Sequence, residues 1–184
     1  PVRRDALALL KLRRLRTVPE LYEHVLDLMA VLYSADPVET GREWLNLGLW
    51  TATTRSYEEA CDQLATRLAE EGRFGPEDRI LDVGCGTGTS TRFWHDLVRR
   101  HHGRSPTLLG LNITPSHIRT AESRIAGHAL WEKHLRFQLG DATRLRGLDD
   151  GAFTRVAALD SAFHFDPRER FFREAYRVLA PGGR

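Results

Sequence analysis

Long apolar runs are missing from this chain of 184 residues. Their absence excludes a membrane-spanning helix, which needs about 20 consecutive apolar residues. A secretory signal pattern is also missing, because the first residues alternate charged side chains with leucine. Only two cysteines are present, Cys61 and Cys85, in different contexts. A single disulfide stays open as an alternative, but two isolated thiols are more typical of a reducing compartment, so we expect a cytoplasmic protein.

The charge balance gives little support to a polyanionic partner. The formal net charge is +2, and we expect no nucleic-acid partner. Residues 1–16, however, hold six basic residues against one acidic residue, a local net charge of +5. Such a leucine-rich start can make peripheral contact with an anionic membrane or act as an organelle presequence. The alternative, which we favour, is a solvated surface helix or a frayed terminus.

Residues 79–91 read Arg-Ile-Leu-Asp-Val-Gly-Cys-Gly-Thr-Gly-Thr-Ser-Thr. The apolar residues at 80–83 predict a strand buried on both faces, and the glycines after them predict a tight turn. A helix follows, whose expected N-cap is Thr89, Ser90 or Thr91. This order of strand, glycine turn and helix brings bare backbone up to a nucleotide-like ligand. The alternative is a tight turn that binds nothing.

The spacing of the glycines separates two kinds of nucleotide site. A dinucleotide fingerprint has glycines at positions 1, 3 and 6 of its turn. Here they lie at positions 1, 3 and 5, two residues after an acidic side chain, which we expect to face the cationic end of a ligand. Residues 81–88 resemble the first motif of the class I S-adenosylmethionine-dependent methyltransferases, in the small-molecule, type 11-like group. The resemblance implies that S-adenosylmethionine is the cofactor and that this loop holds its methionine half through Asp82, Gly84, Cys85, Gly86 and Gly88.

The next two strands carry further cofactor residues of the resemblance. Residues 107–111 predict a buried strand, and Thr114 with Pro115 predicts the start of a helix. The family places an acid after this strand for the ribose hydroxyls, whereas this chain has Asn112, followed by Ile113. Residues 135–139 alternate apolar and polar side chains, which predicts a strand with one solvent-exposed face or an edge position, and the resemblance implies the edge. The resemblance then implies that Asp141 binds the adenine amino group and that the backbone of Ala142 meets the ring.

The last part of the chain adds the candidate catalytic residue. Residues 153–159 predict a fourth strand, after which the resemblance assigns Asp160 to the cofactor site. His164 follows in a Ser-x-x-His setting, and we expect it to act as general base for a hydroxyl acceptor. The alternative is a structural histidine packed between its two phenylalanine neighbours. A helix from Pro167 is predicted to bury Phe171, Phe172, Ala175, Val178 and Leu179, and residues 180–183 resemble the turn before a fifth strand.

These elements predict an α/β fold with a doubly wound parallel sheet, and the resemblance implies a Rossmann-like strand order of 3-2-1-4. We expect two parts: an N-terminal helical lid segment, 1–55, with helices at 5–16 and 20–33, and a cofactor-binding domain, 56–184. A capping box at Ser56 and Glu59 predicts a helix that ends at Gly72. The family continues through three more strands, so we expect a fragment or an unusually truncated member.

The predicted function is methyl transfer from S-adenosylmethionine to a small lipophilic or natural-product acceptor. Trp44, Trp50, Phe163 and Phe165 are expected to form its apolar acceptor pocket, although the two tryptophans fit a core role equally well. A catalytically inactive, methyltransferase-like binding module is the main alternative, and a nicotinamide-dependent oxidoreductase is a weaker one. We expect no metal site, because the pair His101–His102 lacks companion ligands. The sequence predicts neither the acceptor nor the oligomeric state.

Overall fold

A computed structural model describes residue 17, residues 20–22 and residues 43–184. The helices predicted over 5–16 and 20–33 lie outside the described residues, except for Glu20–Tyr22, which is helical. Within the described part, no helix is both long and apolar enough to cross a membrane. The elements are, in order, α4 (Tyr57–Gly72), β1 (Arg79–Val83), α5 (Thr89–His102), β2 (Thr107–Asn112), α6 (Pro115–Ile125), α7 (Ala129–His134), β3 (Leu135–Leu139), β4 (Arg155–Ala157), the 3-10 turn η1 (Ala162–His164) and α8 (Arg168–Val178).

The four strands form one parallel sheet in the order β3-β2-β1-β4, which confirms the predicted topology. Strand β1 lies between β2 and β4, so its residues are buried on both faces, as the apolar run predicts. Strand β3 is at the edge of the sheet, and Leu135 is the one buried residue among its five. All four strands point the same way, so their carboxyl ends meet at one edge, where α/β sheets bind ligands.

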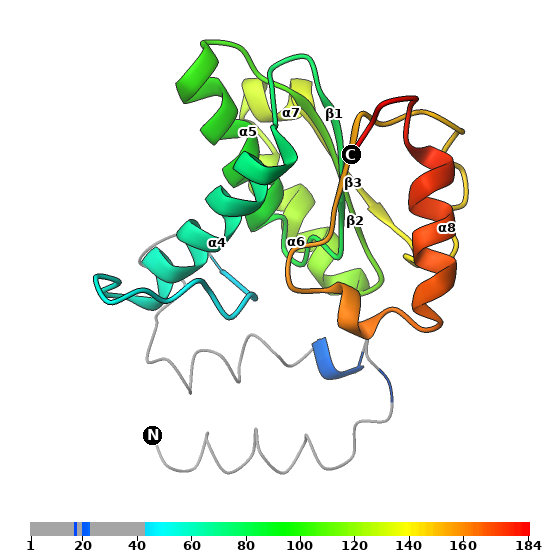
Figure 1. The fold of residues 1–184 in the computed structure, drawn as a ribbon, viewed down its shortest axis with the longest axis horizontal. Coiled ribbons are helices and arrows are strands. Elements are labelled where there is room, and N and C mark those ends of the chain that lie inside the picture. The colour runs from blue at the N-terminus through cyan, green and yellow to red at the C-terminus, as the bar shows by residue number, and fades with distance from the viewer. Residues whose placement is uncertain (1–16, 18–19, 23–42) are drawn as a thin grey trace.

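Helices cover both faces of the sheet (Figure 1). Helices α4, α5, α6 and α7 lie on one side and α8 lies on the other. A hydrophobic core lies on each face of the sheet, and alternate residues of β1 belong to one core or the other. Ile80 packs with Trp94 on the α4–α5 side, whereas Leu81 packs with Phe171 and Val178 of α8. The fold is therefore doubly wound, and a rigid core on each face holds the carboxyl ends of the strands in place.

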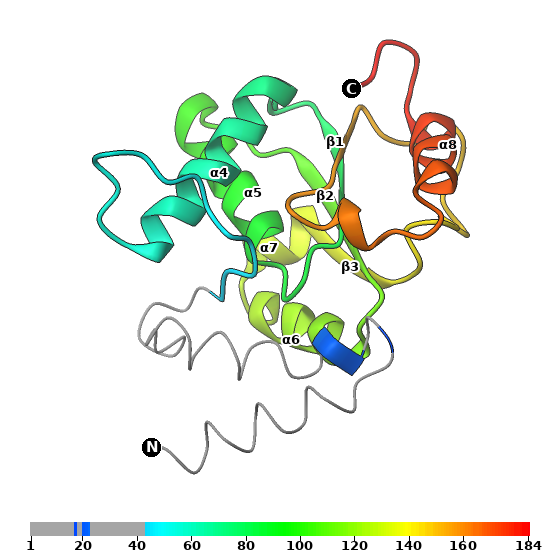
Figure 2. The ribbon, with the colours of Figure 1, turned by 60° about the horizontal axis from the view of Figure 1, so that its bottom comes forward.

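Residues 43–50 run beside α4 (Figure 2). The Leu49 N–H donates to Ala60 O at 2.8 Å, and the Tyr57 hydroxyl donates to Asn46 O at 2.7 Å. Trp44 is buried and packs against Phe93, so it has a core role. The division of the chain between residues 55 and 56 remains a prediction.

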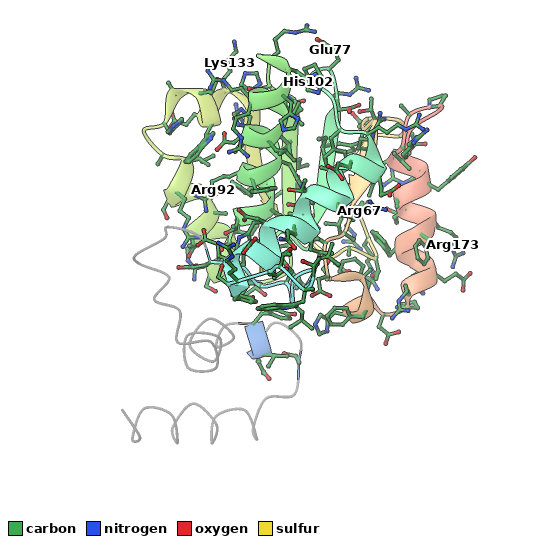
Figure 3. The ribbon with its side chains drawn as sticks, turned by 60° about the vertical axis from the view of Figure 1, so that its left-hand side comes forward. Arg67, Glu77, Arg92, His102, Lys133 and Arg173 are labelled. Atoms are coloured by element: carbon green, nitrogen blue, oxygen red, sulfur yellow. The ribbon has the colours of Figure 1, made fainter. Side chains whose placement is uncertain are left out.

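Helix α4 begins as predicted at Ser56, whose hydroxyl accepts from the Glu59 N–H at 3.1 Å. The returning bond of the capping box is shifted by one residue, because the Glu59 carboxylate accepts from the Arg55 N–H. Charged side chains of the helices, among them Arg67, Lys133 and Arg173, point away from the core (Figure 3).

The structure differs from the sequence-based expectations at three places. Strand β4 is three residues long, not seven: only Arg155–Ala157 pair with β1, opposite Ile80–Asp82, and Phe153 pairs with Leu179 instead. Helix α7 was not predicted. In α8 the side chain of Phe172 is 60% exposed, so the prediction that it is buried was wrong. Phe171, Ala175 and Val178 are buried at helical spacing, and Phe172 is turned away from that stripe.

Candidate functional site

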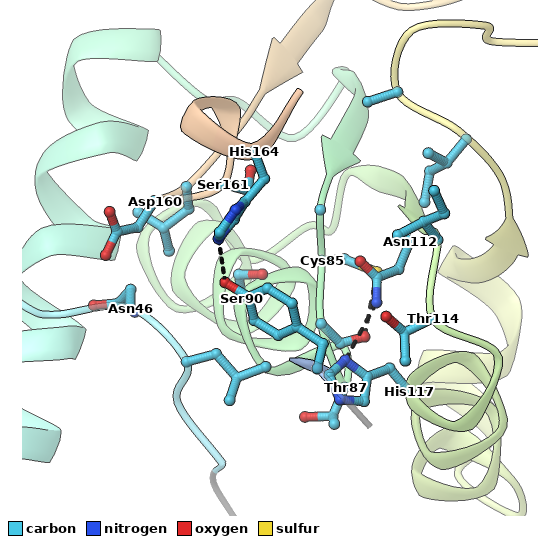
Figure 4. A pocket seen from close by; sticks show the side chains of 18 of the residues that line it. Asn46, Cys85, Thr87, Ser90, Asn112, Thr114, His117, Asp160, Ser161 and His164 are labelled. Atoms are coloured by element: carbon cyan, nitrogen blue, oxygen red, sulfur yellow. Dashed lines mark hydrogen bonds between the residues drawn. The ribbon is translucent and has the colours of Figure 1, made fainter. Parts of the chain in front are cut away.

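A cavity of about 300 Å³ opens at the carboxyl ends of the four strands (Figure 4). It collects residues from segments that are far apart in the chain. Most of the predicted site residues line it: Gly84, Cys85, Gly86, Asn112, Ile113, Asp141, Ala142, Asp160 and His164. Asp82 and Gly88 do not line it.

The glycine loop brings bare backbone to the wall of this cavity. The Gly84 N–H donates to Leu111 O at 2.7 Å, which fastens the end of β1 to β2. A Cβ atom on Gly84 would lie 2.5 Å from Ser161 Cβ. Gly86 has a φ of +55°, and a Cβ atom there would lie 2.8 Å from Leu45 Cδ1. The positive φ favours glycine at both positions, and at Gly84 the close approach of Ser161 Cβ adds to that requirement.

The carboxylate of Asp82 lies beneath the loop, fully buried. Its Oδ2 accepts hydrogen bonds from the hydroxyls of Ser90 and Thr91, both at 2.7 Å. These hydroxyls therefore hold Asp82 and do not cap α5. The N-cap is Gly88, at a φ of +77°, which corrects the expected cap at residues 89–91. Burial raises the pKa of Asp82 to about 6, although the two hydroxyl bonds oppose the rise.

Two polar side chains follow the ends of β2 and β3. Asn112 is buried, and its Nδ2 lies 3.3 Å from His117 Nδ1, on the first turn of α6. Asp141 accepts from both the backbone N–H and the hydroxyl of Thr143, at 2.8 and 2.9 Å. These bonds fix the Asp141 carboxylate in a local turn next to the buried Ala142.

His164 reaches the cavity from the turn after β4. Its Nε2 lies 2.8 Å from the hydroxyl of Tyr22, and Glu20–Tyr22 thereby lies against this side of the site. Burial lowers the pKa of His164, and Asp160 opposes the shift. Burial and the nearby Asp160 raise the pKa of Tyr22, so the tyrosine keeps its proton. Where the Tyr22 hydroxyl donates this bond, His164 Nε2 is the acceptor and the neutral imidazole carries its proton on Nδ1.

Asp160 joins two walls of the cavity. Its Oδ2 accepts from the Leu47 N–H at 2.8 Å, which ties residues 43–50 to the loop after β4. Among the four aromatic residues predicted to form an acceptor pocket, Trp44 and Phe165 line the cavity. Trp50 and Phe163 do not, and their side chains are 54% and 56% exposed.

Several further residues line the cavity that the sequence did not assign to the site, among them Tyr22, Leu45 and His117. Tyr22 contacts His164 across 142 positions of the chain, a separation that no local pattern encodes. His117 carries a signal that was readable, since it lies on the first turn of a predicted helix, five residues after Asn112. No group of three or more histidine, cysteine or acidic side chains is placed to hold a metal ion in residues 17, 20–22 and 43–184.

Comparison with known proteins points to one family. A family model described as a methyltransferase domain matches residues 81–184. The chain is 39% identical over 140 residues to erythromycin 3''-O-methyltransferase of Saccharopolyspora erythraea, covering 76% of this chain and 44% of that protein. It is 33% identical over 142 residues to 27-O-demethylrifamycin SV methyltransferase of Amycolatopsis mediterranei, covering 77% of this chain and 49% of that protein. The chain thus spans about half the length of the curated relatives it matches.

A similar solved structure is that of the 4+2 cyclase SpnF, with a TM-score of 0.72 and 26% identity. The match covers 91% of this chain and 58% of the cyclase. Fold, glycine loop and sequence agree: the chain belongs to the class I S-adenosylmethionine-dependent methyltransferases.

Proposed function

We propose that this chain binds S-adenosylmethionine in the cavity and transfers its methyl group to a hydroxyl of a small lipophilic acceptor. The observation that carries the proposal is the meeting of the glycine loop, Asn112, Asp141 and His164 around one cavity. The glycine loop gives the ligand backbone groups to bind. Asn112 and Asp141 give it polar side chains, and His164 supplies a base on the remaining wall.

The residues present fit this cofactor. Gly84 and Gly86 line the cavity with backbone alone, because neither residue has a side chain. Asp82 Oδ1 is buried and has no hydrogen-bond partner among the described residues, which leaves negative charge directly below the loop. A cationic ligand above the loop complements that charge. Asn112 and Asp141 line the same cavity, and the resemblance assigns them to the ribose hydroxyls and the adenine amino group.

When bound, S-adenosylmethionine supplies a methyl group that its sulfonium already activates, so the protein mainly has to position the acceptor and exclude water. Trp44, Leu45 and Phe165 give the cavity apolar walls for that purpose. Burial lowers the pKa of His164, which favours the neutral imidazole, and with Nε2 unprotonated this ring can accept the acceptor's hydroxyl proton. Because Tyr22 occupies Nε2 at 2.8 Å, an acceptor hydroxyl has to replace the tyrosine hydroxyl there.

The acceptor class rests on the lining and on the relatives. Two relatives are named for methylation of erythromycin and of 27-O-demethylrifamycin SV, and both names refer to large natural products. The apolar lining of this cavity suits an acceptor of that kind. We therefore infer an alcohol on a lipophilic natural product as the methyl acceptor.

A binding module without methyl transfer is the second candidate. Two observations favour it: Tyr22 already holds His164 Nε2, and a protein of similar fold is named a 4+2 cyclase. This candidate also predicts binding of S-adenosylmethionine, so binding alone does not separate it from the enzyme.

A transfer assay separates the two. The chain is incubated with methyl-labelled S-adenosylmethionine and a panel of macrolide, ansamycin and phenolic alcohols. We expect label in at least one acceptor, together with stoichiometric S-adenosylhomocysteine, detected by mass spectrometry. Binding of S-adenosylmethionine without label in any acceptor of the panel would favour the binding module over the enzyme.

A further inference from the structure

Asn112 and His117 form a buried polar pair on the wall of the cavity. Asn112 ends β2 and is 9% exposed, and His117 lies on the first turn of α6 and is 2% exposed. The Nδ2 of Asn112 lies 3.3 Å from Nδ1 of His117, and the two side chains face each other at the cavity (Figure 4). Both residues line the cavity.

The atoms in contact determine the proton positions. An amide nitrogen can only donate, so His117 Nδ1 has to be the acceptor and its ring proton sits on Nε2. The other end of the amide, Oδ1, is thereby turned away from the histidine. The amide therefore presents the acceptor Oδ1 on the side away from His117, next to the second N–H of Nδ2.

The pair is held from both ends. The Gly140 N–H donates to the backbone oxygen of Asn112 at 2.9 Å, which fixes the end of β2 against the turn after β3. The Tyr22 ring packs edge-on against His117, with centroids 6.1 Å apart and planes at 85°. His117 therefore has little freedom to release the amide.

We propose that His117 is a positioning residue that turns Asn112 Oδ1 toward a ribose hydroxyl of the bound nucleoside. The inference rests on the proposed function, since it takes the nucleoside part of S-adenosylmethionine to lie at Asn112. An asparagine amide has two orientations of nearly the same shape, which exchange Oδ1 and Nδ2. Only one of them turns the acceptor Oδ1 toward the ribose hydroxyl, whereas a carboxylate accepts with either oxygen. His117 removes that ambiguity, which an acidic residue at the same position would not have.

The first test compares two ligands by calorimetry: S-adenosylhomocysteine and its 2′,3′-dideoxy analogue. For the unaltered chain we expect the analogue to bind about tenfold more weakly, the loss of one well-made hydrogen bond. In His117→Ala, S-adenosylhomocysteine should weaken by about the same factor while the analogue is unchanged, because only the diol uses Asn112 Oδ1. The comparison within the unaltered chain needs no substitution, so it stands even if His117→Ala folds poorly.

The second test repeats the comparison with Asn112→Asp. Its two equivalent oxygens need no orientation, so removing His117 from this variant should not weaken S-adenosylhomocysteine. A purely structural histidine would cost affinity in both backgrounds and for both ligands, and that result would overturn the inference. Equal binding of both ligands to the unaltered chain would overturn it as well, and would leave the proposed function standing. Failure of the unaltered chain to bind S-adenosylhomocysteine at all would overturn both.

Discussion

Gly86→Val is expected to lower the affinity for S-adenosylmethionine by at least about 100-fold. The φ of +55° at Gly86 is costly for a β-branched side chain, and the new Cβ would lie 2.8 Å from Leu45 Cδ1. The backbone strain falls on a loop that lines the cavity, and the Leu45 side chain also has to turn away from the new Cβ. Calorimetric titration with S-adenosylmethionine measures the loss directly.

Gly127→Val is the matched control for this substitution. Gly127 also has a positive φ, +78°, but a Cβ atom there would meet nothing within 4 Å and the residue does not line the cavity. The control therefore carries a similar backbone strain without the contact. We expect its affinity to stay within about twofold of that of the unaltered chain. Equal losses in both variants would mean that strain in the fold, and not the loop itself, weakens binding.

His164→Ala is expected to slow methyl transfer by about 100-fold, the lower end of the range for loss of a general base. Binding of S-adenosylhomocysteine should change by less than about twofold, because the imidazole serves the acceptor and not the cofactor. The measurement is single-turnover transfer to whichever alcohol the assay identifies, with His101→Ala, an exposed histidine on the last turn of α5, as the control.

The pH profile gives a second readout for His164. Because burial lowers the pKa of His164, the base form is already present below the ordinary histidine value of 6.5. The transfer rate of the unaltered chain should therefore rise with pH through a pKa below 6.5 and then level off. In His164→Ala this step should disappear. An unchanged rate and profile in the variant would contradict the role as base and leave His164 a structural partner of Tyr22.

The sequence predicted the centre of the fold well because its signals there are local. The apolar run at 80–83, the glycines and the following helix each follow from adjacent residues, and the structure has them in that order. The resemblance supplied the strand order, which local patterns do not encode. The exposed Phe172 shows the limit: the helical period was readable, but which neighbouring stripe faces the sheet depends on how α8 packs.

At the site, the sequence predicted which residues line the cavity better than it predicted which hydrogen bonds they make. Most of the predicted residues line the cavity, yet Asp82 lies below the loop, held by two hydroxyls that were expected to cap a helix. Whether the Ser90 and Thr91 hydroxyls cap α5 or donate hydrogen bonds to the buried Asp82 carboxylate depends on the direction of α5 relative to β1. The role of Tyr22 could not be predicted for a different reason. Its contact with His164 joins segments that are far apart in the sequence and meet only in the folded chain.

The most direct test of the account is a parallel calorimetric titration of this chain with S-adenosylmethionine, S-adenosylhomocysteine and NAD. The account predicts micromolar binding of both sulfur compounds and no measurable binding of NAD, because the glycines at 84, 86 and 88 lack the spacing of a dinucleotide site. Binding of NAD without binding of either sulfur compound would contradict it.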